Sequence, residues 1–165
     1  DTSLPDVGFV YLPGGYPELY LAALSANRQM LQSIRRYVES GGKLLAECGG
    51  MMYLCDEIRD KNGDVYPMAG VLHQSATMEN MKLRLGYRTL LYNETRLKGH
   101  EFHYSRLVEQ QNPLPSCAVA YTAKGVETDT PLYHYKNVWA GYTHLYWADP
   151  VGNEWFTKFV IDGNT

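Results

Sequence analysis

The chain has 165 residues, of which 45% are hydrophobic and 20% charged, as is typical of one globular domain with a substantial core. Its formal net charge of −3, without a cluster of Lys and Arg, argues against a nucleic-acid surface. No apolar run approaches the roughly 20 residues that span a bilayer, and no secretory signal is expected. Three cysteines without metal-ligand spacing indicate reduced thiols in a cytoplasmic protein.

The first sixty residues alternate between strand-like and helix-like patterns, with Pro and Gly marking the loops. Ser25 or Asn27 is expected to cap the second helix. The order strand, helix, strand, helix is typical of a parallel sheet with helices packed on it. The predicted elements are a strand at 7–12, a loop at 13–17, helices at 19–24 and 27–38, a strand at 43–47 and a helix at 49–58.

The second half reads as several strands and one closing helix. Short turn signals such as Tyr92-Asn93-Glu94 and Lys124-Gly125 separate the strands, which favours antiparallel hairpins over helical crossovers. The closing helix carries its large apolar side chains on one face. The predicted elements are strands at 81–92, 96–107, 117–122 and 139–147 and a helix at 149–161.

A cysteine stands where a nucleophile is expected. Cys48 follows the apolar strand and precedes Gly49 and Gly50 at the start of a helix. A strand that turns sharply into a helix exposes the side chain at its bend, and a helix N-terminus stabilises a thiolate. We expect the glycines to permit the bend, because a Cβ would clash there. A buried structural cysteine before a glycine turn is the alternative.

Two glycine loops end neighbouring predicted parallel strands, at the sheet edge where open α/β folds carry their active sites. A thiolate that attacks an amide or ester carbonyl creates an oxyanion, which needs two backbone N–H donors. Gly49 and either Gly14 or Gly15 are the candidates. A cysteine nucleophile also needs a base, and a folded sheet can bring His144 to Cys48. The histidines of the chain, each with a structural role as the alternative, are His73, His100, His103, His134 and His144.

Five segments, Leu12–Leu19, Ala46–Leu54, Met68–Val71, Leu85–Arg88 and Gly99–Ser105, carry a resemblance to a known family. In this order they resemble the glutaminase domain of cobyrinic acid a,c-diamide synthase, and they run through most of the chain. Ala-Glu-Cys-Gly-Gly and Gly-His-Glu-Phe-His-Tyr-Ser favour the diamide synthases over the related cobyric acid synthases. The resemblance implies an α/β, flavodoxin-like, three-layer class I glutamine amidotransferase fold with a mixed sheet.

In that family the matching cysteine attacks the side-chain amide of glutamine, a thioester forms, and ammonia passes to an ATP-dependent domain. The resemblance makes Cys48 the nucleophile and His144 its activating histidine. Most class I amidotransferases add a Glu two residues after the histidine, where this chain has Tyr146. The resemblance implies that the cobyrinate branch works as a Cys–His pair. The implied function is glutamine hydrolysis that supplies ammonia for ATP-dependent a,c-diamidation of cobyrinic acid in cobalamin biosynthesis.

The resemblance also implies parts outside this chain, namely an ATP-binding synthase domain and an upstream strand and helix. The chain has no Gly-x-x-x-x-Gly-Lys-Ser/Thr motif, so ATP and Mg are expected to bind the synthase domain, with no cofactor in this fragment. We expect residues 1–165 to form a single glutaminase domain, a C-terminal fragment truncated at the N-terminal edge of its sheet. The expected partners are glutamine, the synthase domain and, indirectly, a corrinoid. An open sheet edge also favours self-association and low activity of the isolated piece.

Other chemically suggestive residues have a plain structural alternative. Strand alternation places Glu101 and His103 on one face and His100 on the other, which disfavours a metal site at this segment. Glu101 and His103 are expected to shape the glutamine pocket or the domain interface, or to be structural. Cys55 and Cys117 are expected to be core thiols. The aromatic residues near the C-terminus, Tyr133, Tyr135, Trp139, Tyr142 and Trp147, form either a ligand-stacking surface or, as we expect, core packing.

Two other functions fit the same fold. One is a non-catalytic or differently coupled ammonia-donor module, for example one that serves cobyric acid synthase or another tetrapyrrole amidase. The other is a cysteine hydrolase that acts on other amides, which is disfavoured because Gly99–Ser105 has no evident role there.

Overall fold

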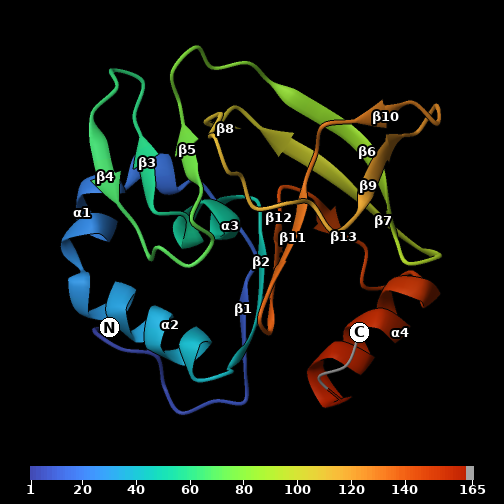
Figure 1. The fold of residues 1–165 in the computed structure, drawn as a ribbon, viewed down its shortest axis with the longest axis horizontal. Helices are drawn as coiled ribbons and strands as arrows, with labels where there is room; N and C mark the ends of the chain where they lie inside the picture. Colours follow the sequence, from blue (N-terminus) through green and yellow to red (C-terminus); the bar gives the residue numbers. More distant parts are fainter. Residues whose placement is uncertain (163–165) are drawn as a thin grey trace.

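The computed structural model describes residues 1–162 and contains three sheets with helices on both sides of the central one (Figure 1). The central sheet has the strand order β1-β2-β12-β11. β1 (Phe9–Leu12), β2 (Lys43–Glu47) and β12 (Val138–Gly141) are parallel, and β11 (Leu132–Tyr135) is antiparallel to β12. The sheet is therefore mixed, as the resemblance implied.

The helices lie on two sides of this sheet. A 3₁₀ turn, η1 (Pro17–Leu19), leads into α1 (Leu21–Ala26) and α2 (Arg28–Glu39). Asn27 is the N-cap of α2, since its side chain accepts a hydrogen bond of 3.2 Å from the Met30 N–H. α3 (Gly49–Leu54) follows β2, and α4 (Pro150–Asp162) begins at Pro150, a residue suited to the first helical position. Figure 1 shows α1, α2 and α3 on one side of β1 and β2 and α4 on the other.

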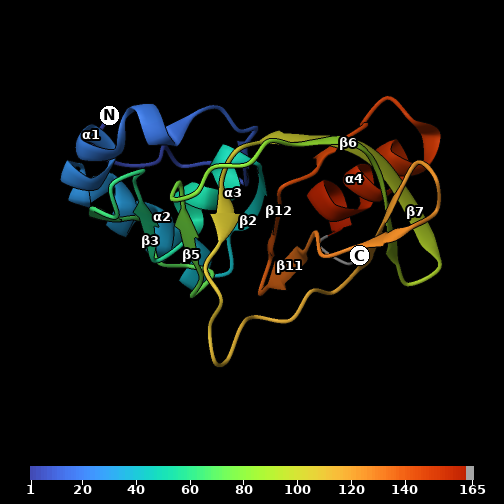
Figure 2. The ribbon, with the colours of Figure 1, turned by 90° about the horizontal axis from the view of Figure 1, so that it is seen from above.

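Two further sheets surround the central one (Figure 2). The first is a five-stranded antiparallel sheet with the order β10-β9-β6-β7-β13, and the second is a small mixed sheet with the order β4-β3-β5-β8. The strands of the first are β10 (Glu127–Thr128), β9 (Val119–Thr122), β6 (Arg84–Tyr92), β7 (Thr95–His103) and β13 (His144–Leu145). Those of the second are β4 (Val65–Pro67), β3 (Glu57–Arg59), β5 (Ser75–Thr77) and β8 (Arg106–Leu107).

The core consists of two apolar clusters separated by the central sheet. Successive side chains of β2 point to opposite faces, so Leu44 and Ala46 pack toward α2 and α3 while Leu45 packs on the other side. Leu45 shares its cluster with Trp139 and with Trp155 of α4. This arrangement confirms the three-layer expectation, with the antiparallel sheet and α4 together forming the third layer.

The structure corrects the predicted strand at 139–147. Its first part is β12, which is antiparallel to β11 but parallel to β2, and its second part is the separate strand β13. All four residues of β12 are buried, because this strand lies between β2 and β11 in the sheet centre. A fully buried strand has no polar face, so its sequence lacks the alternation that marks exposed hairpins.

The predicted helix at 49–58 is too long. α3 ends at Leu54, and the extended backbone of Cys55 leads into β3. Ile58 of β3 is fully buried and pairs with Ala76 of β5, so sheet pairing outweighs local helical spacing here. The predicted strand at 96–107 is split into β7 and β8, which belong to different sheets. Five short strands, β3, β4, β5, β10 and β11, were not predicted. In the described part of the chain β1 pairs only with β2; the predicted loss of an edge unit stays a prediction.

Candidate active site

Cys48 lies at a sharp bend between β2 and α3. Its backbone has φ +50° and ψ −115°, a conformation that L-residues rarely adopt. The Cys48 N–H donates a hydrogen bond of 2.8 Å to the Gly141 carbonyl of β12, which holds the bend against the central sheet. Strained backbone of this kind concentrates at functional sites. The elbow predicted from the sequence is confirmed, but the cysteine itself adopts the positive φ.

The two glycines after Cys48 serve close packing and not the bend. A Cβ on Gly49 would lie 2.3 Å from the Gly15 carbonyl oxygen, and one on Gly50 would lie 2.3 Å from that of Leu12. Neither glycine has a positive φ. The predicted clash of a Cβ is confirmed, but its cause is not the bend: the glycines allow the loop after β1 to approach the start of α3. This packing places Gly15 beside Gly49.

His144 of β13 meets Cys48 across the fold. If Gly14 carried a Cβ, that atom would lie 3.0 Å from His144 Cε1 and 3.4 Å from Cys48 Cβ. Gly14 therefore packs against both side chains. The hydrogen bond with Cys48, and then the one with Glu47, raises the pKa of His144 to about 9. The structure thus brings Cys48, His144 and the predicted glycine loop together in one place.

The other four histidines lie elsewhere or have structural contacts. His100 of β7 stacks on His144, with ring centroids 5.1 Å apart, and does not replace it. His103 stacks on Tyr142 at 3.8 Å. His73 is exposed and lies 3.3 Å from Asp56, and His134 stacks on Trp139.

The structure gives Cys55 and Cys117, and most of the aromatic residues near the C-terminus, a structural role rather than a role in the site. Burial raises the pKa of the Cys55 thiol, and it also raises that of Cys117, to about 11. Both cysteines are free, and Cys48 is the one that lies at the bend. Of the five aromatic residues, Tyr133, Trp139 and Tyr142 are buried, as core packing requires.

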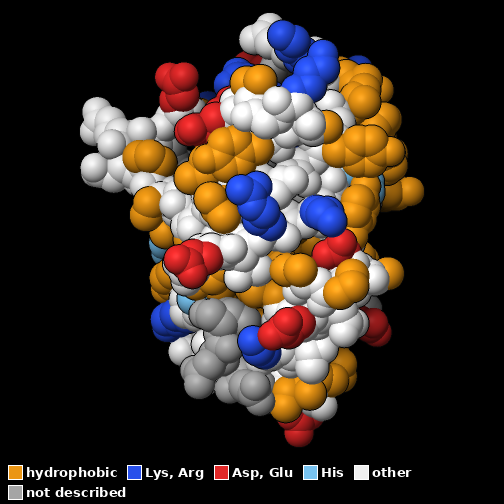
Figure 3. All heavy atoms as spheres, turned by 90° about the vertical axis from the view of Figure 1, so that its right-hand side faces the viewer, with side chains coloured by type: hydrophobic (Ala, Val, Ile, Leu, Met, Phe, Trp, Pro, Cys, Tyr) orange, Lys and Arg blue, Asp and Glu red, His pale blue; other side chains and the backbone are white. Residues whose placement is uncertain are grey.

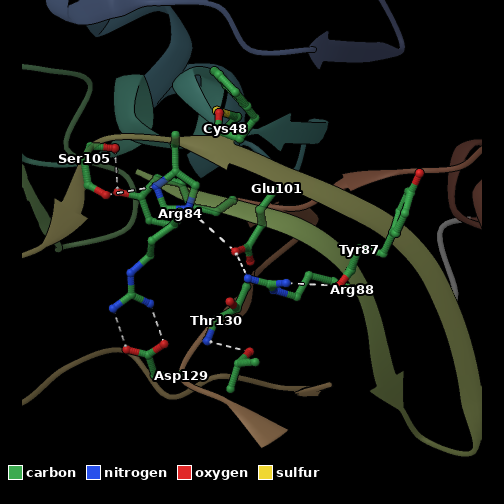
Figure 4. Close-up of polar contacts among 12 residues, drawn as sticks. Cys48, Arg84, Tyr87, Arg88, Glu101, Ser105, Asp129 and Thr130 are labelled. Carbon is green, nitrogen blue, oxygen red and sulfur yellow. Dashed lines mark hydrogen bonds and ion pairs between the residues drawn. The ribbon is translucent and has the colours of Figure 1, made fainter. Parts of the chain in front are cut away.

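Glu101 and His103 lie on the buried face of β7, as alternation predicted, with His100 on the other face. Glu101 Oε2 forms an ion pair of 3.0 Å with Arg88, and Figure 4 shows the two side chains pointing toward each other. Burial by itself raises the pKa of Glu101, but contacts with His103, Thr130 and Arg88 outweigh it and lower this pKa. These two residues form a separate polar cluster, and their role toward glutamine stays a prediction.

The sequence reasoning missed Glu47, the residue before the nucleophile. Its carboxylate is almost completely buried, and Oε2 lies 3.5 Å from His144 Nδ1. The Tyr11 hydroxyl donates to Oε2 at 2.7 Å, and the Leu145 N–H donates to Oε1 at 3.0 Å. A charged residue that ends an otherwise apolar buried strand was the available signal, because carboxylates are rarely buried without partners.

Residues 1–162 contain neither a metal-binding cluster nor a helix that could span a membrane. Among these residues no three His, Cys, Asp or Glu side chains lie together in a way that would hold a metal ion. None of the helices in this part of the chain has the length and apolarity to cross a membrane.

Comparison with known proteins identifies the family. A family model described as a CobB/CobQ-like glutamine amidotransferase domain matches residues 1–151. The chain belongs to this family. A hydrogenobyrinate a,c-diamide synthase of Pseudomonas aeruginosa is 38% identical over 151 residues, covering 88% of this chain and 33% of the relative. A cobyrinate a,c-diamide synthase of Salmonella typhimurium is 34% identical over 156 residues. This match covers 90% of this chain and 34% of the relative. The chain spans about a third of the length of these curated relatives.

Solved structures agree on the fold of this CobB/CobQ-like domain. A glutamine amidotransferase crystal structure has a TM-score of 0.57 at 18% identity and covers 93% of this chain and 79% of its own. The structure of PurLQS from Thermotoga maritima has a TM-score of 0.56 at 16% identity. The match covers 86% of this chain and 70% of the PurLQS chain. These likenesses support the class I amidotransferase fold that the resemblance implied.

Proposed function

We propose that this CobB/CobQ-like domain hydrolyses glutamine and supplies ammonia to an ATP-dependent ligase that amidates the a and c carboxylates of a corrinoid. The observation that carries the proposal is the position of His144 beside Cys48, with both side chains against Gly14 at the strained bend after β2. The names of the relatives support cobyrinate or hydrogenobyrinate as the acceptor.

In the proposed reaction the Cys48 thiolate attacks the side-chain carbonyl carbon of glutamine. The backbone N–H groups of Gly49 and of Gly14 or Gly15 receive the negative charge that develops on the oxygen. The C–N bond then breaks, and the His144 imidazolium gives its proton to the departing nitrogen, which leaves as ammonia. A water molecule, deprotonated by His144, attacks the resulting thioester, and glutamate leaves as the thiolate is restored.

Exposed apolar side chains beside this site support a docked ligase domain. Leu85 and Tyr87 of β6 are 59% and 67% exposed, and they line a shallow hollow with Phe102 and Tyr146. His100 lines the same hollow and stacks on His144, so the hollow opens next to the proposed pair. Figure 3 shows further hydrophobic side chains at the surface on the side of the molecule where α4 and the β6–β7 hairpin lie. Such patches mark protein interfaces.

The test is Cys48→Ser in the full-length protein. We expect this change to abolish glutamine-dependent amidation while amidation from added ammonia persists, because only the ammonia source is lost. Cys55→Ser is the matched control, since Cys55 is a buried thiol about two helical turns further along, at the end of α3. A protein with Cys48→Ser that still hydrolyses glutamine would refute the proposal, as would loss of hydrolysis in Cys55→Ser alone.

A further inference from the structure

The site lacks a carboxylate at the position where most class I amidotransferases have one. That position, two residues after His144, is Tyr146, whose ring stacks on His100 at 5.7 Å. A histidine that activates a thiol works best when a third group fixes its orientation and stabilises its charge. The question is therefore whether another residue provides this group.

The position of Glu47 suits a group that orients His144 and stabilises its charge. One carboxylate oxygen, Oε2, lies 3.5 Å from His144 Nδ1, which leaves the opposite ring nitrogen for the Cys48 thiol. The side chain of Glu47 is 4% exposed and that of His144 is 26% exposed, so water screens the pair only in part. Because Glu47 ends β2 and Cys48 follows it directly at the bend, consecutive backbone fixes the two groups relative to each other.

The remaining contacts of Glu47 hold its carboxylate in place. Oε1 accepts the N–H of Leu145, the residue after His144, so the backbone beside the histidine is tied to the same carboxylate. Oε2 accepts the Tyr11 hydroxyl, which in turn accepts a hydrogen bond of 3.4 Å from Trp147 Nε1. Burial and then the bond to Glu47 raise the pKa of Tyr11 to about 12, so Tyr11 acts as a neutral donor.

We propose that Glu47 is the positioning residue of this site, a third member that orients His144 and stabilises its imidazolium from the residue before the nucleophile. This inference rests on the proposed function. The titratable groups around His144 are Glu47 from β2, Cys48 at the start of α3 and the stacked His100 from β7. Among these, Glu47 supplies the carboxylate, with Tyr11 of β1 behind it.

A purely structural role is the competing explanation, because Glu47 also ties β2 to β1 and β13. Glu47→Gln separates the two roles, since it keeps the size and an oxygen acceptor but removes the charge. The test measures kcat and KM for glutamine hydrolysis across pH in the full-length protein, with circular dichroism and thermal unfolding as the measure of correct folding.

We expect Glu47→Gln to lower kcat about 10- to 100-fold, with little change in KM for glutamine. This loss should be smaller than that caused by removing His144, the base. The alkaline limit of activity should move down by about one pH unit, because the imidazolium loses an adjacent negative charge. Glu47→Asp, which keeps the charge on a shorter side chain, should give intermediate values. If Glu47→Gln does not fold, the alkaline limit of activity is measured in Glu47→Asp instead, where a smaller downward move is expected.

An unchanged alkaline limit in the folded variants would overturn the inference and leave Glu47 a structural residue. Equal loss of ammonia-dependent and glutamine-dependent amidation, with an unchanged pH profile, would do the same. The two proposals fail separately. If Cys48→Ser retains glutamine hydrolysis, the proposed function is wrong; if Cys48→Ser is inactive and Glu47→Gln matches the unaltered protein, only the role of Glu47 is wrong.

Discussion

Gly99 of β7 is a sensitive position although it does not face the proposed nucleophile. β7 pairs with β13 through His100 opposite His144 and Gly99 opposite Leu145. A Cβ on Gly99 would lie 2.2 Å from the His144 carbonyl oxygen and 2.7 Å from Thr143 Cγ2. The nearest obstacle is backbone, so no side-chain rotation relieves the contact, and Gly99→Ala must push β13 away.

The size of this displacement follows from the contact distance. Real Cβ contacts essentially never fall below 3.0 Å, so the carbonyl must retreat from 2.2 Å to at least 3.0 Å, about 0.8 Å. His144 lies in the displaced strand and moves with it. A misplacement of about 1 Å costs on the order of 100-fold in rate. The strain of overpacking adds about 1–3 kcal/mol of destabilisation, which corresponds to a fall of about 2–10 °C in Tm.

The assay is glutamate release by the full-length protein, together with thermal unfolding followed by circular dichroism. Gly8→Ala is the matched control, because a Cβ there meets nothing within 4 Å and the residue has no positive φ. We expect Gly8→Ala to match the unaltered protein in both measurements. Gly99→Ala with an unchanged rate of glutamine hydrolysis would show that the position of β13 does not control His144.

Four other outcomes follow from the structure. Arg88→Met should cost about 3–5 kcal/mol in urea unfolding, because the buried Glu101 loses its ion pair with Arg88 and keeps only His103 and Thr130 beside it; a loss below about 1 kcal/mol would contradict this. Because the pKa of His144 is raised in the folded protein, its protonation stabilises the fold fully below about pH 6.5, and this stabilisation is lost as the pH rises toward about 9. The urea midpoint should therefore fall over that pH range, and it should fall less steeply in Glu47→Gln. Leu85→Ser should uncouple glutamine hydrolysis from amidation, whereas Val126→Ser, equally exposed at a distant turn, should not. Light scattering should detect self-association through β1, and a strictly monomeric chain would argue against an open edge there.

The sequence by itself determined the local part of the site. The change from an apolar strand to a helix-like run at Cys48 marks the bend, and the two glycines after it and the Pro/Gly loop after the first strand mark the two segments that pack together there. Helical spacing and the Asn27 cap likewise placed α2 correctly, because capping and periodicity depend on residues a few positions apart.

The tertiary structure decided which distant groups meet at Cys48. The resemblance singled out His144, but the residues alone left five histidines as candidates, and the pairing of β13 with β7 is what brings His144 rather than His100 to the thiol. The same pairing splits the predicted strand at 139–147 and leaves β12 to join β2. The place of Glu47 at the end of an apolar strand indicates a buried carboxylate but not its contact with His144, because their separation of about a hundred residues is closed only when two sheets pack together. Such contacts depend on packing over the whole chain, which periodicity and turn signals do not encode.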